Sequence, residues 1–433
     1  MKKTNPIYKS IVYLYVSSKN ILFELFFDVT QLIERVSRKY NLLKLIFKKW
    51  IKTLNNSGFD FVGIKSHLEY ATEAKSIYKV LNKDRKGISV GQVFSTIEEP
   101  RIINNTLPDI CLYLHNDVLI HSQNDEILDM NHHTIINDFD KVIERDSNFK
   151  NNTGVVIIQK GSKALVNIPK KTPTKITSGI MVVNNFSNNY YHAIYEVLIR
   201  FEIINELKTI PKEIPLLVDQ IIRDIPQLYE IFKIANTAGR NVIWIEKDQF
   251  YHIEQLYYIS QINIVPSVAK NIYSVGLSDF GYDYEMILSF TNKLLLNQDK
   301  SGSYPHKVFL SRKGHARAYN EKEILPIIKS HGFTIVQTEK YSFAQQMKMF
   351  NNAEIIVGPT GAAITNTIFC KLSAKIVCFT VGDENLPIFP TGAYIRGVRM
   401  VYLKGIQHGK YSQYAYTIDP IALNDMLIEV SKL

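Results

Sequence analysis

The sequence predicts an α/β protein built from two domains, and three observations support this. The chain has 433 residues, whereas a single hydrophobic core rarely grows beyond about 250–300 residues. Hydrophobic residues make up 46% of the chain and charged residues 21%, which is ordinary for a globular protein and excludes wholesale disorder. From about residue 178 onward, short apolar segments alternate with amphipathic ones. That pattern is typical of the strands and helices of a doubly wound parallel sheet.

The first 95 residues (1–95) predict a helical N-terminal extension. Apolar residues recur at helical spacing over 21–36 and again over 40–54. The second stretch is rich in lysine and contains Trp50, a pattern found in amphipathic helices that lie on anionic membranes. A helical hairpin packed on the rest of the protein, or on a second copy, explains the same pattern. Both interpretations stay open.

The segment 96–300 predicts a first α/β domain, and the segment 301–433 predicts a second. The first begins with a β-rich part at about 95–170 and ends in a linker at about 274–304. After residue 170 its predicted strands are 180–183, 215–218 and 241–245, and its predicted helices are 190–207 and 227–238. In the second domain the predicted strands are 308–310, 333–336, 354–357 and 375–379, with helices at 321–331, 343–351 and 362–369.

Charge, cysteines and hydropathy limit the classes of function. The formal net charge of +10 favours acidic partners, but the basic residues are dispersed and form no nucleic-acid motif, so no nucleic-acid partner is expected. Cys111, Cys370 and Cys378 have neither a disulfide framework nor zinc-ligand spacing, so no metal is expected and a reducing compartment fits. There is no clean signal peptide, and no apolar run reaches the roughly 18 residues of a membrane span. The sequence therefore predicts a cytoplasmic protein.

Two predicted strands end in residues suited to phosphate. The strand 308–310 runs into Ser311 and Arg312, and ligands of open parallel sheets bind beyond the carboxyl ends of strands. The strand 355–357 runs into Gly358-Pro359-Thr360-Gly361, before a helix that begins at Ala362 and carries Asn366. Free amides at a helix start attract phosphate. A plain tight turn capped by Thr360 fits the same spacing, so the residues alone leave the alternative open.

A third segment carries a candidate base. His192 and Glu196 are four residues apart on a predicted helix, so they share a face. A carboxylate beside an imidazole holds one tautomer and suits a general base, although such pairs are also common on helix surfaces.

These segments, in this order, resemble glycosyltransferase family 61. The matching motifs are Asn189-Tyr190-Tyr191-His192, Leu310-Ser311-Arg312, Asn320-Glu321, Gly332-Phe333, Phe343-Ala344-Gln345-Gln346, Gly358-Pro359-Thr360-Gly361-Ala362 and Thr365-Asn366. The resemblance covers about residues 108–379. One position departs from the family pattern, since the family usually has His where this chain has Thr360.

The resemblance implies a GT-B-like architecture, with two facing Rossmann-like domains and an inverting mechanism that needs no cofactor or obligatory metal. It implies that Arg312 and the amides near Thr360, Gly361 and Ala362 stabilise a departing nucleotide diphosphate, and that His192, aided by Glu196, is the general base or grips the donor sugar. Asn320 and Glu321 would orient Arg312 or bind ribose, unless Asn320 is a plain helix cap. The remaining donor-binding residues would be Ser311, Gln337, Thr338, Gln346, Gly358, Pro359 and Asn366.

The function implied is transfer of a sugar from a nucleotide-sugar, of the UDP-linked class, to a glycan or lipid-linked glycan acceptor of capsule or lipopolysaccharide type. The acceptor-side domain would be 96–300. The resemblance does not cover the first 95 residues, so a location at the inner face of the cell membrane depends on the membrane interpretation of the N-terminal helices. The alternative is a catalytically degenerate module of the same fold that binds glycans or assembles a complex. The sequence leaves the oligomeric state, including a homo-oligomer, open.

Overall fold

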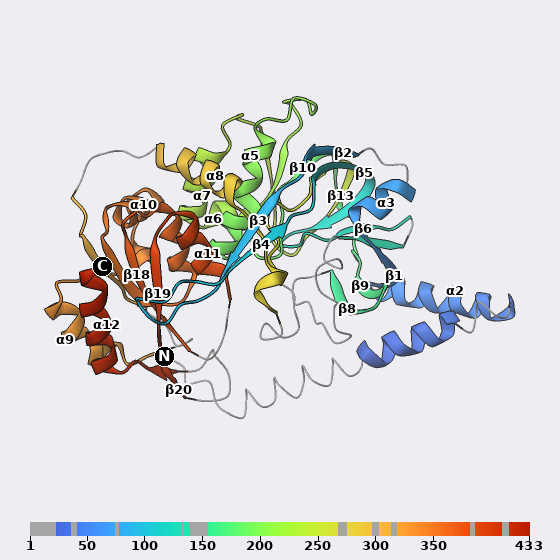
Figure 1. Ribbon diagram of the computed structural model, residues 1–433. Coiled ribbons are helices and arrows are strands. Elements are labelled where there is room, and N and C mark those ends of the chain that lie inside the picture. The colour runs from blue at the N-terminus through green and yellow to red at the C-terminus, as the bar shows by residue number, and fades with distance from the viewer. Residues whose placement is uncertain are drawn as a thin grey trace.

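The computed structural model describes residues 23–35, 41–73, 78–131, 133–137, 155–266, 275–296, 303–312, 318–381, 386–408 and 415–433. A helix over 23–35 and α2 (Asn41–Asn56) come first and project from one end of the molecule (Figure 1). Phe27 of the first helix packs on Phe61 at a ring distance of 5.2 Å, and Trp50 of α2 donates a 2.8 Å hydrogen bond from Nε1 to Thr30 Oγ1. The two helices therefore form a hairpin that rests on the first sheet.

The first sheet has eleven strands in the order β12-β11-β10-β13-β5-β6-β7-β1-β9-β8, with β2 beside β5. Only β10, β11, β12 and β13 make a parallel group, and most of the other pairs are antiparallel. The strands are β1 (Phe59–Lys65), β2 (Tyr78–Asn82), β5 (Ile110–His121), β6 (Ile127–Asp129), β7 (Thr134–Ile136), β8 (Val156–Lys160), β9 (Lys163–Asn167), β10 (Thr174–Met181), β11 (Leu216–Asp219), β12 (Val242–Ile245) and β13 (Phe250–Ile259).

The expectation that the segment 1–95 is helical is wrong for part of the described residues. After α2 the chain enters β1, then α3 (His67–Glu73), β2 and β3 (Lys86–Val90). β1 lies inside the first sheet between β7 and β9, so it gains its hydrogen bonds from strands far along the chain. The division into 1–95, 96–300 and 301–433 stays a prediction.

The second sheet is wholly parallel, in the order β16-β15-β17-β18-β19. The strands are β15 (Lys307–Leu310), β16 (Thr334–Val336), β17 (Ile355–Pro359), β18 (Lys375–Thr380) and β19 (Arg399–Lys404). The central strands β15, β17 and β18 are buried on both faces, as parallel strands usually are, whereas Thr334 and Ile335 of the edge strand β16 are exposed. Phe309, Val357 and Val377 face α9 (Glu321–Ser330) and α12 (Pro420–Lys432). The predicted strands of this half are confirmed, and β19 is an addition.

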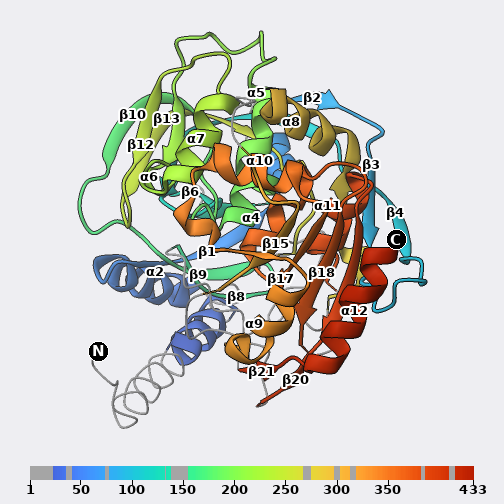
Figure 2. The same cartoon turned by 90° about the vertical axis from the view of Figure 1, so that its left-hand side faces the viewer.

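The opposite face of the second sheet shares its core with the first sheet. One hydrophobic cluster contains Ile180 and Leu216 from the first sheet together with Val308 and Ile356 from the second. Helices fill the space between, and Figure 2 shows this layer in the middle of the molecule. They include α5 (Phe201–Ile204), α7 (Pro226–Ala235), α8 (Tyr284–Leu296), α10 (Phe343–Asn352), η7 (Ala362–Phe369) and α11 (Ile388–Ile395). A mixed α/β fold is confirmed, whereas the GT-B-like arrangement stays a prediction.

The helix predicted over 190–207 is not one regular helix. It consists of α4 (Tyr190–His192), a wide turn of π-helix η2 (Ala193–Val197), a 3₁₀ turn η3 (Leu198–Arg200) and α5. A wide turn of this kind is rare and often marks a functional site. It begins directly after His192 and contains Glu196, the second residue of the predicted base pair. Across all described residues, no helix combines the length and apolar character needed to cross a membrane.

Candidate functional site

The second sheet has a topological switch point between β15 and β17. The chain moves from β15 outward to β16, then returns across β15 to β17, and ligands of open α/β sheets bind beyond the strand ends at such a point. The residues that follow β15 are Ser311 and Arg312, and those that follow β17 are Thr360 and Gly361. The two motifs singled out from the sequence are therefore neighbours.

Arg312 spans this gap. Its Nη1 donates a 3.1 Å hydrogen bond to the carbonyl oxygen of Thr360. A Cβ atom added to Gly361 would lie 3.4 Å from Arg312 Nη2, so the guanidinium rests directly on the backbone of the turn. Arg312 and Gly361 are both half-buried. The site therefore places a partly exposed cation beside the amides that open η7, which is a suitable environment for a diphosphate.

Glu321 holds the end of β15 in place. Its Oε1 accepts a 2.7 Å hydrogen bond from the Ser311 hydroxyl, and its Oε2 accepts from the Arg312 backbone N at 3.2 Å and from the Tyr319 hydroxyl at 2.6 Å. Burial and the Glu321 carboxylate raise the pKa of Tyr319, so this phenol stays a donor. Of the two predicted roles of Glu321, these contacts favour orientation of the Arg312 segment over ribose binding.

The Asn320 side chain makes its hydrogen bonds to other residues of the protein. Its side-chain Oδ1 accepts from the Ile418 backbone N at 2.8 Å, and its Nδ2 donates to the Ile418 carbonyl at 3.0 Å and to Glu323 Oε2 at 2.7 Å. It precedes α9 but makes no side-chain cap bond. These contacts tie the start of α9 to the segment that leads into α12.

The carboxyl end of β17 requires a glycine. A Cβ at Gly358 would lie 2.7 Å from Leu310 Cβ and 3.2 Å from the Leu310 carbonyl, so only glycine fits between β15 and β17. Thr360 does not cap η7. The N-cap is Gly361, without a side-chain bond. Thr360 instead donates its backbone N–H to Phe379 O at 2.8 Å, and its side chain lowers the pKa of the Cys378 thiol against the larger effect of burial, which raises it. The predicted cap is therefore wrong.

Gln337 and Thr338 follow β16, the strand beside β15. In the described part of the chain the buried Oε1 atom of Gln337 has no hydrogen-bond partner, and such orphaned atoms in a native fold call for an explanation, often a ligand or water. This is consistent with the predicted contact to a base or ribose. The Thr338 carbonyl accepts from Gln346 Nε2 at 2.8 Å.

Gln346 and Asn366 are buried, with exposed fractions of 5% and 0%. Asn366 Nδ2 donates to Gln346 Oε1 at 2.9 Å, and Asn366 Oδ1 accepts from the Tyr190 hydroxyl at 2.6 Å. Both polar atoms of the Asn366 side chain are thus bonded inside the protein. This placement argues against a direct donor contact by Asn366.

The predicted base pair lies on the helix that Tyr190 begins. His192 Nδ1 is hydrogen-bonded to Glu196 Oε1, with side-chain exposed fractions of 16% and 2%. Phe186 stacks on the imidazole at a ring distance of 4.8 Å, and Asn189 caps the helix by accepting from Tyr191 N at 3.0 Å. If Nδ1 carries the proton, Nε2 is left to accept one, which is the tautomer a general base needs.

Behind this pair lies a buried cluster that sequence reasoning missed. Burial, reinforced by the Glu126 and Glu196 carboxylates, raises the pKa of Asp125 to about 8, although Arg200 opposes the shift. Arg200 is 0% exposed, and its three guanidinium nitrogens have no hydrogen-bond partner within the described ranges. The one sequence pattern that points to this cluster is the four-residue spacing of His192, Glu196 and Arg200, which places the three on one face of a helix.

Asp219 shapes the loop that precedes His192. It accepts from Gln123 N at 2.6 Å and Asn184 N at 3.2 Å, and from the Ser187 hydroxyl. Burial raises its pKa to about 6 in spite of these bonds.

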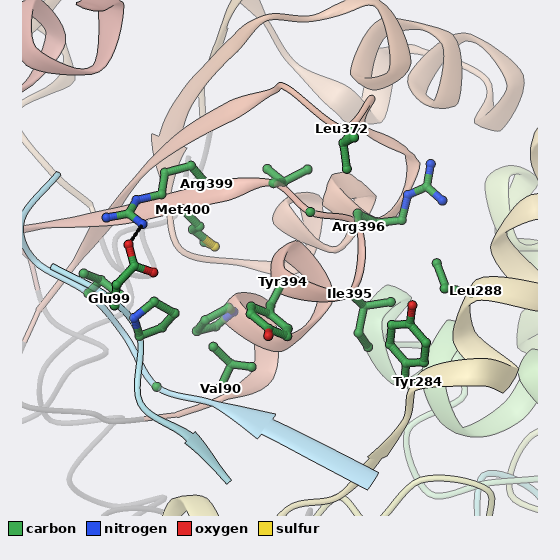
Figure 3. Close-up of a pocket in the computed structure, with 16 residues that line it drawn as sticks. Val90, Glu99, Tyr284, Leu288, Leu372, Tyr394, Ile395, Arg396, Arg399 and Met400 are labelled. Atoms are coloured by element: carbon green, nitrogen blue, oxygen red, sulfur yellow. Dashed lines mark hydrogen bonds and ion pairs between the residues drawn. The ribbon is translucent and has the colours of Figure 1, made fainter. Parts of the chain in front are cut away.

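A separate cavity of about 920 Å³ lies at the amino end of β19 (Figure 3). Tyr284, Tyr394 and Arg396 line it, as does Arg399, which forms a 2.8 Å ion pair with Glu99. Because it lies at the amino ends of the strands, it is distinct from the switch point.

Comparison with known proteins supports the interpretation of the motifs. No curated protein matches the chain. Residues 190–377, which run from the start of α4 through β18, match the model of the family Glycosyltransferase 61. That segment contains every candidate site residue predicted from the sequence. This match supports membership of glycosyltransferase family 61 and, with it, a glycosyltransferase activity.

Proposed function

We propose that this protein is an inverting glycosyltransferase that uses a nucleotide-sugar, of the UDP-linked class, to extend a cell-surface glycan of capsule or lipopolysaccharide type. The observation that carries the proposal is the position of Arg312. Its guanidinium lies on Gly361 and bonds the Thr360 carbonyl, at the switch point where an α/β sheet binds its ligand.

In the proposed inverting transfer, each residue of the site has one role. The acceptor hydroxyl oxygen forms a bond to C1 of the donor sugar while the bond from C1 to the phosphate oxygen breaks. The proton of the acceptor hydroxyl passes to His192 Nε2, and Glu196 stabilises the imidazolium through Nδ1. The nucleoside diphosphate leaves with the electron pair, and Arg312 together with the amides of the η7 turn stabilises its charge. We infer that this mechanism needs no metal or other cofactor.

The site of action we propose is the inner face of the cell membrane. Leu25 and Leu32 of the first helix are 61% and 59% exposed, and Lys48, Lys49 and Lys52 are exposed on α2. Apolar and basic side chains on one protruding hairpin suit an anionic lipid surface, where a lipid-linked glycan acceptor is held.

The alternative is a degenerate module that binds glycans without turnover. Thr360 is the observation in its favour, because it stands where the family usually has His. The Arg312 cradle and the His192–Glu196 pair favour the enzyme, since a module without turnover needs neither.

A thermal-shift panel of nucleotides and nucleotide-sugars tests the proposal, because a ligand that binds the native state raises Tm. We expect one nucleotide class to raise Tm in the wild type, with and without EDTA, and the shift to be lost in Arg312→Ala. Arg101→Ala is the matched control, because Arg101 is exposed and lies far from Arg312 in the sequence. This variant should keep the shift in Tm. If well-folded wild type responds to no nucleotide, the donor site is refuted and the degenerate module becomes the better account.

A further inference from the structure

The helix that carries His192 is bonded directly to the element that begins at the donor turn. Tyr190 is the first residue of α4 and comes from the half of the chain that forms the first sheet. Asn366 lies in η7, directly after the turn on which Arg312 rests. The 2.6 Å hydrogen bond from the Tyr190 hydroxyl to Asn366 Oδ1 therefore joins the base-bearing helix to the donor-binding turn.

This bond is one end of a longer chain of hydrogen bonds. Asn366 Nδ2 donates to Gln346 Oε1 at 2.9 Å, and Gln346 Nε2 donates to the carbonyls of Thr338 and Tyr341 at 2.8 and 3.1 Å. Thr338 follows β16. One continuous network thus runs from α4, through η7 and α10, to the far edge of the switch point.

Each amide in the network has a defined orientation. The phenol of Tyr190 keeps its proton, since burial and the Glu230 carboxylate raise its pKa, and it must therefore donate. Asn366 then accepts with Oδ1 and donates with Nδ2, and Gln346 does the same with Oε1 and Nε2. Because Asn366 is 0% exposed, exchange of these bonds for water is costly.

Neighbouring contacts hold the same two layers together. Gln227 Nε2 on α7 donates to the Tyr341 carbonyl at 2.9 Å, and Glu230 Oε2 on α7 accepts from Ala344 N at 3.2 Å. On the other side of α4, a Cβ at Gly392 of α11 would lie 2.4 Å from the Tyr195 hydroxyl. The segment that carries the base therefore contacts α11, and α7 beside it is bonded to the start of α10.

We propose that Tyr190, Asn366 and Gln346 are positioning residues, an inter-sheet latch that sets the distance from the His192 imidazole to the donor turn, and that Asn366 does not bind the donor. The inference rests on the proposed transfer at this edge. It predicts that loss of the latch leaves donor binding intact and slows the transfer, because a base displaced by even 1 Å loses much of its effect.

Tyr190→Phe is the sharpest variant, since it deletes one oxygen and keeps the ring. Tyr70→Phe is its matched control, because Tyr70 is also a buried donor, bonded to Asp129 Oδ2 at 2.5 Å in the first sheet. We expect Tyr190→Phe to lower kcat at least tenfold, with donor Kd and KM unchanged within twofold, and Tyr70→Phe to leave kcat unchanged. The latch is refuted if Tyr190→Phe keeps wild-type kcat, or if Asn366→Ala weakens nucleotide binding as strongly as Arg312→Ala does.

A double-mutant cycle tests the latch without any substrate. Tyr190→Phe, Asn366→Ala and the double variant are unfolded in urea, and a direct bond predicts that the double variant is destabilised by clearly less than the sum of the two singles. Additive effects contradict the latch. If no nucleotide binds the wild type, the proposed function fails, yet the cycle still decides whether the latch exists.

Discussion

Among single residues, Asp125 has the property that is easiest to test. Its carboxyl group is 2% exposed, and burial raises its pKa to about 8 from an ordinary value of 3.8. Three charged groups act on this carboxyl group. The carboxylates of Glu126 and Glu196 raise the pKa of Asp125 further, and the Arg200 guanidinium lowers it. Asn185 Nδ2 donates to Asp125 Oδ1 at 2.5 Å.

The first prediction concerns stability against pH. Between pH 4 and 8 the folded state keeps the Asp125 proton and the unfolded state has released it, so the free energy of unfolding falls as pH rises through this window. One proton corresponds to a slope of at most about 1.4 kcal/mol per pH unit. Urea unfolding at several pH values should show the decline in the wild type, and Asp125→Asn should flatten it between pH 6.5 and 8.

Asp219 provides the matched control for this prediction. Burial raises its pKa only to about 6, so Asp219→Asn should flatten the decline below pH 6 and leave the upper part unchanged. An identical slope in the wild type and in Asp125→Asn between pH 6.5 and 8 would show that Asp125 ionises normally.

At the scale of elements, local pattern predicted the second sheet well. Each predicted strand of this half lies within about two residues of its observed position, because parallel strands buried on both faces are continuous apolar runs that end at polar turns. The helix after 190 shows where pattern fails. Its apolar residues suit a regular helix, and local periodicity does not distinguish such a helix from the π turn at Ala193–Val197.

The first sheet and the hydrogen bonds among Tyr190, Asn366 and Gln346 were harder to predict from the sequence. β1 is defined by pairing with β7 and β9, strands that lie about seventy to a hundred residues later, so its position depends on long-range contacts. In the same way, the sequence singled out Asn366 and Gln346, but their bonds to Tyr190 and to each other depend on how the two sheets meet. Arg312 and Gly361 were predictable as neighbours because strand order places them together.

The N-terminal hairpin carries a prediction of its own, namely binding to anionic vesicles. Each leucine that is fully buried in the membrane interface contributes about 1.5–3 kcal/mol to the binding free energy. Each lysine near the anionic headgroups contributes about 1 kcal/mol. In co-sedimentation with phosphatidylglycerol vesicles, the variant with Leu25→Ser and Leu32→Ser should bind at least tenfold more weakly than the wild type.

Leu372→Ser is the control for the hairpin, since Leu372 is 73% exposed but lies near β18 in the other half of the molecule. Its binding should equal that of the wild type, and phosphatidylcholine vesicles should bind all three proteins weakly. Equal binding of the wild type and the double leucine variant would exclude the hairpin as the membrane contact and favour its role in packing.

At the scale of the whole molecule, the two sheets share one core. The cluster that includes Ile180, Leu216, Val308 and Ile356 joins the two sheets by apolar packing, and the hydrogen bonds from Tyr190 to Asn366 and from Gln227 to Tyr341 join the same two halves. The latch and the shared core therefore support the same view, in which the base and the donor turn meet in a preformed arrangement.

Such a core predicts that both halves unfold in one cooperative transition. Trp244 on β12 reports the first sheet, once Trp50 is replaced by Phe. Cys370 and Cys378 are fully buried and report the second half through their reaction with a thiol reagent, once Cys111 is replaced by Ser. In a two-state transition, probes of different regions coincide, so fluorescence and thiol reactivity should share one urea midpoint. Thiols that react well below the fluorescence midpoint would mean that the second sheet opens alone, and a hinged pair of domains would then replace the preformed arrangement.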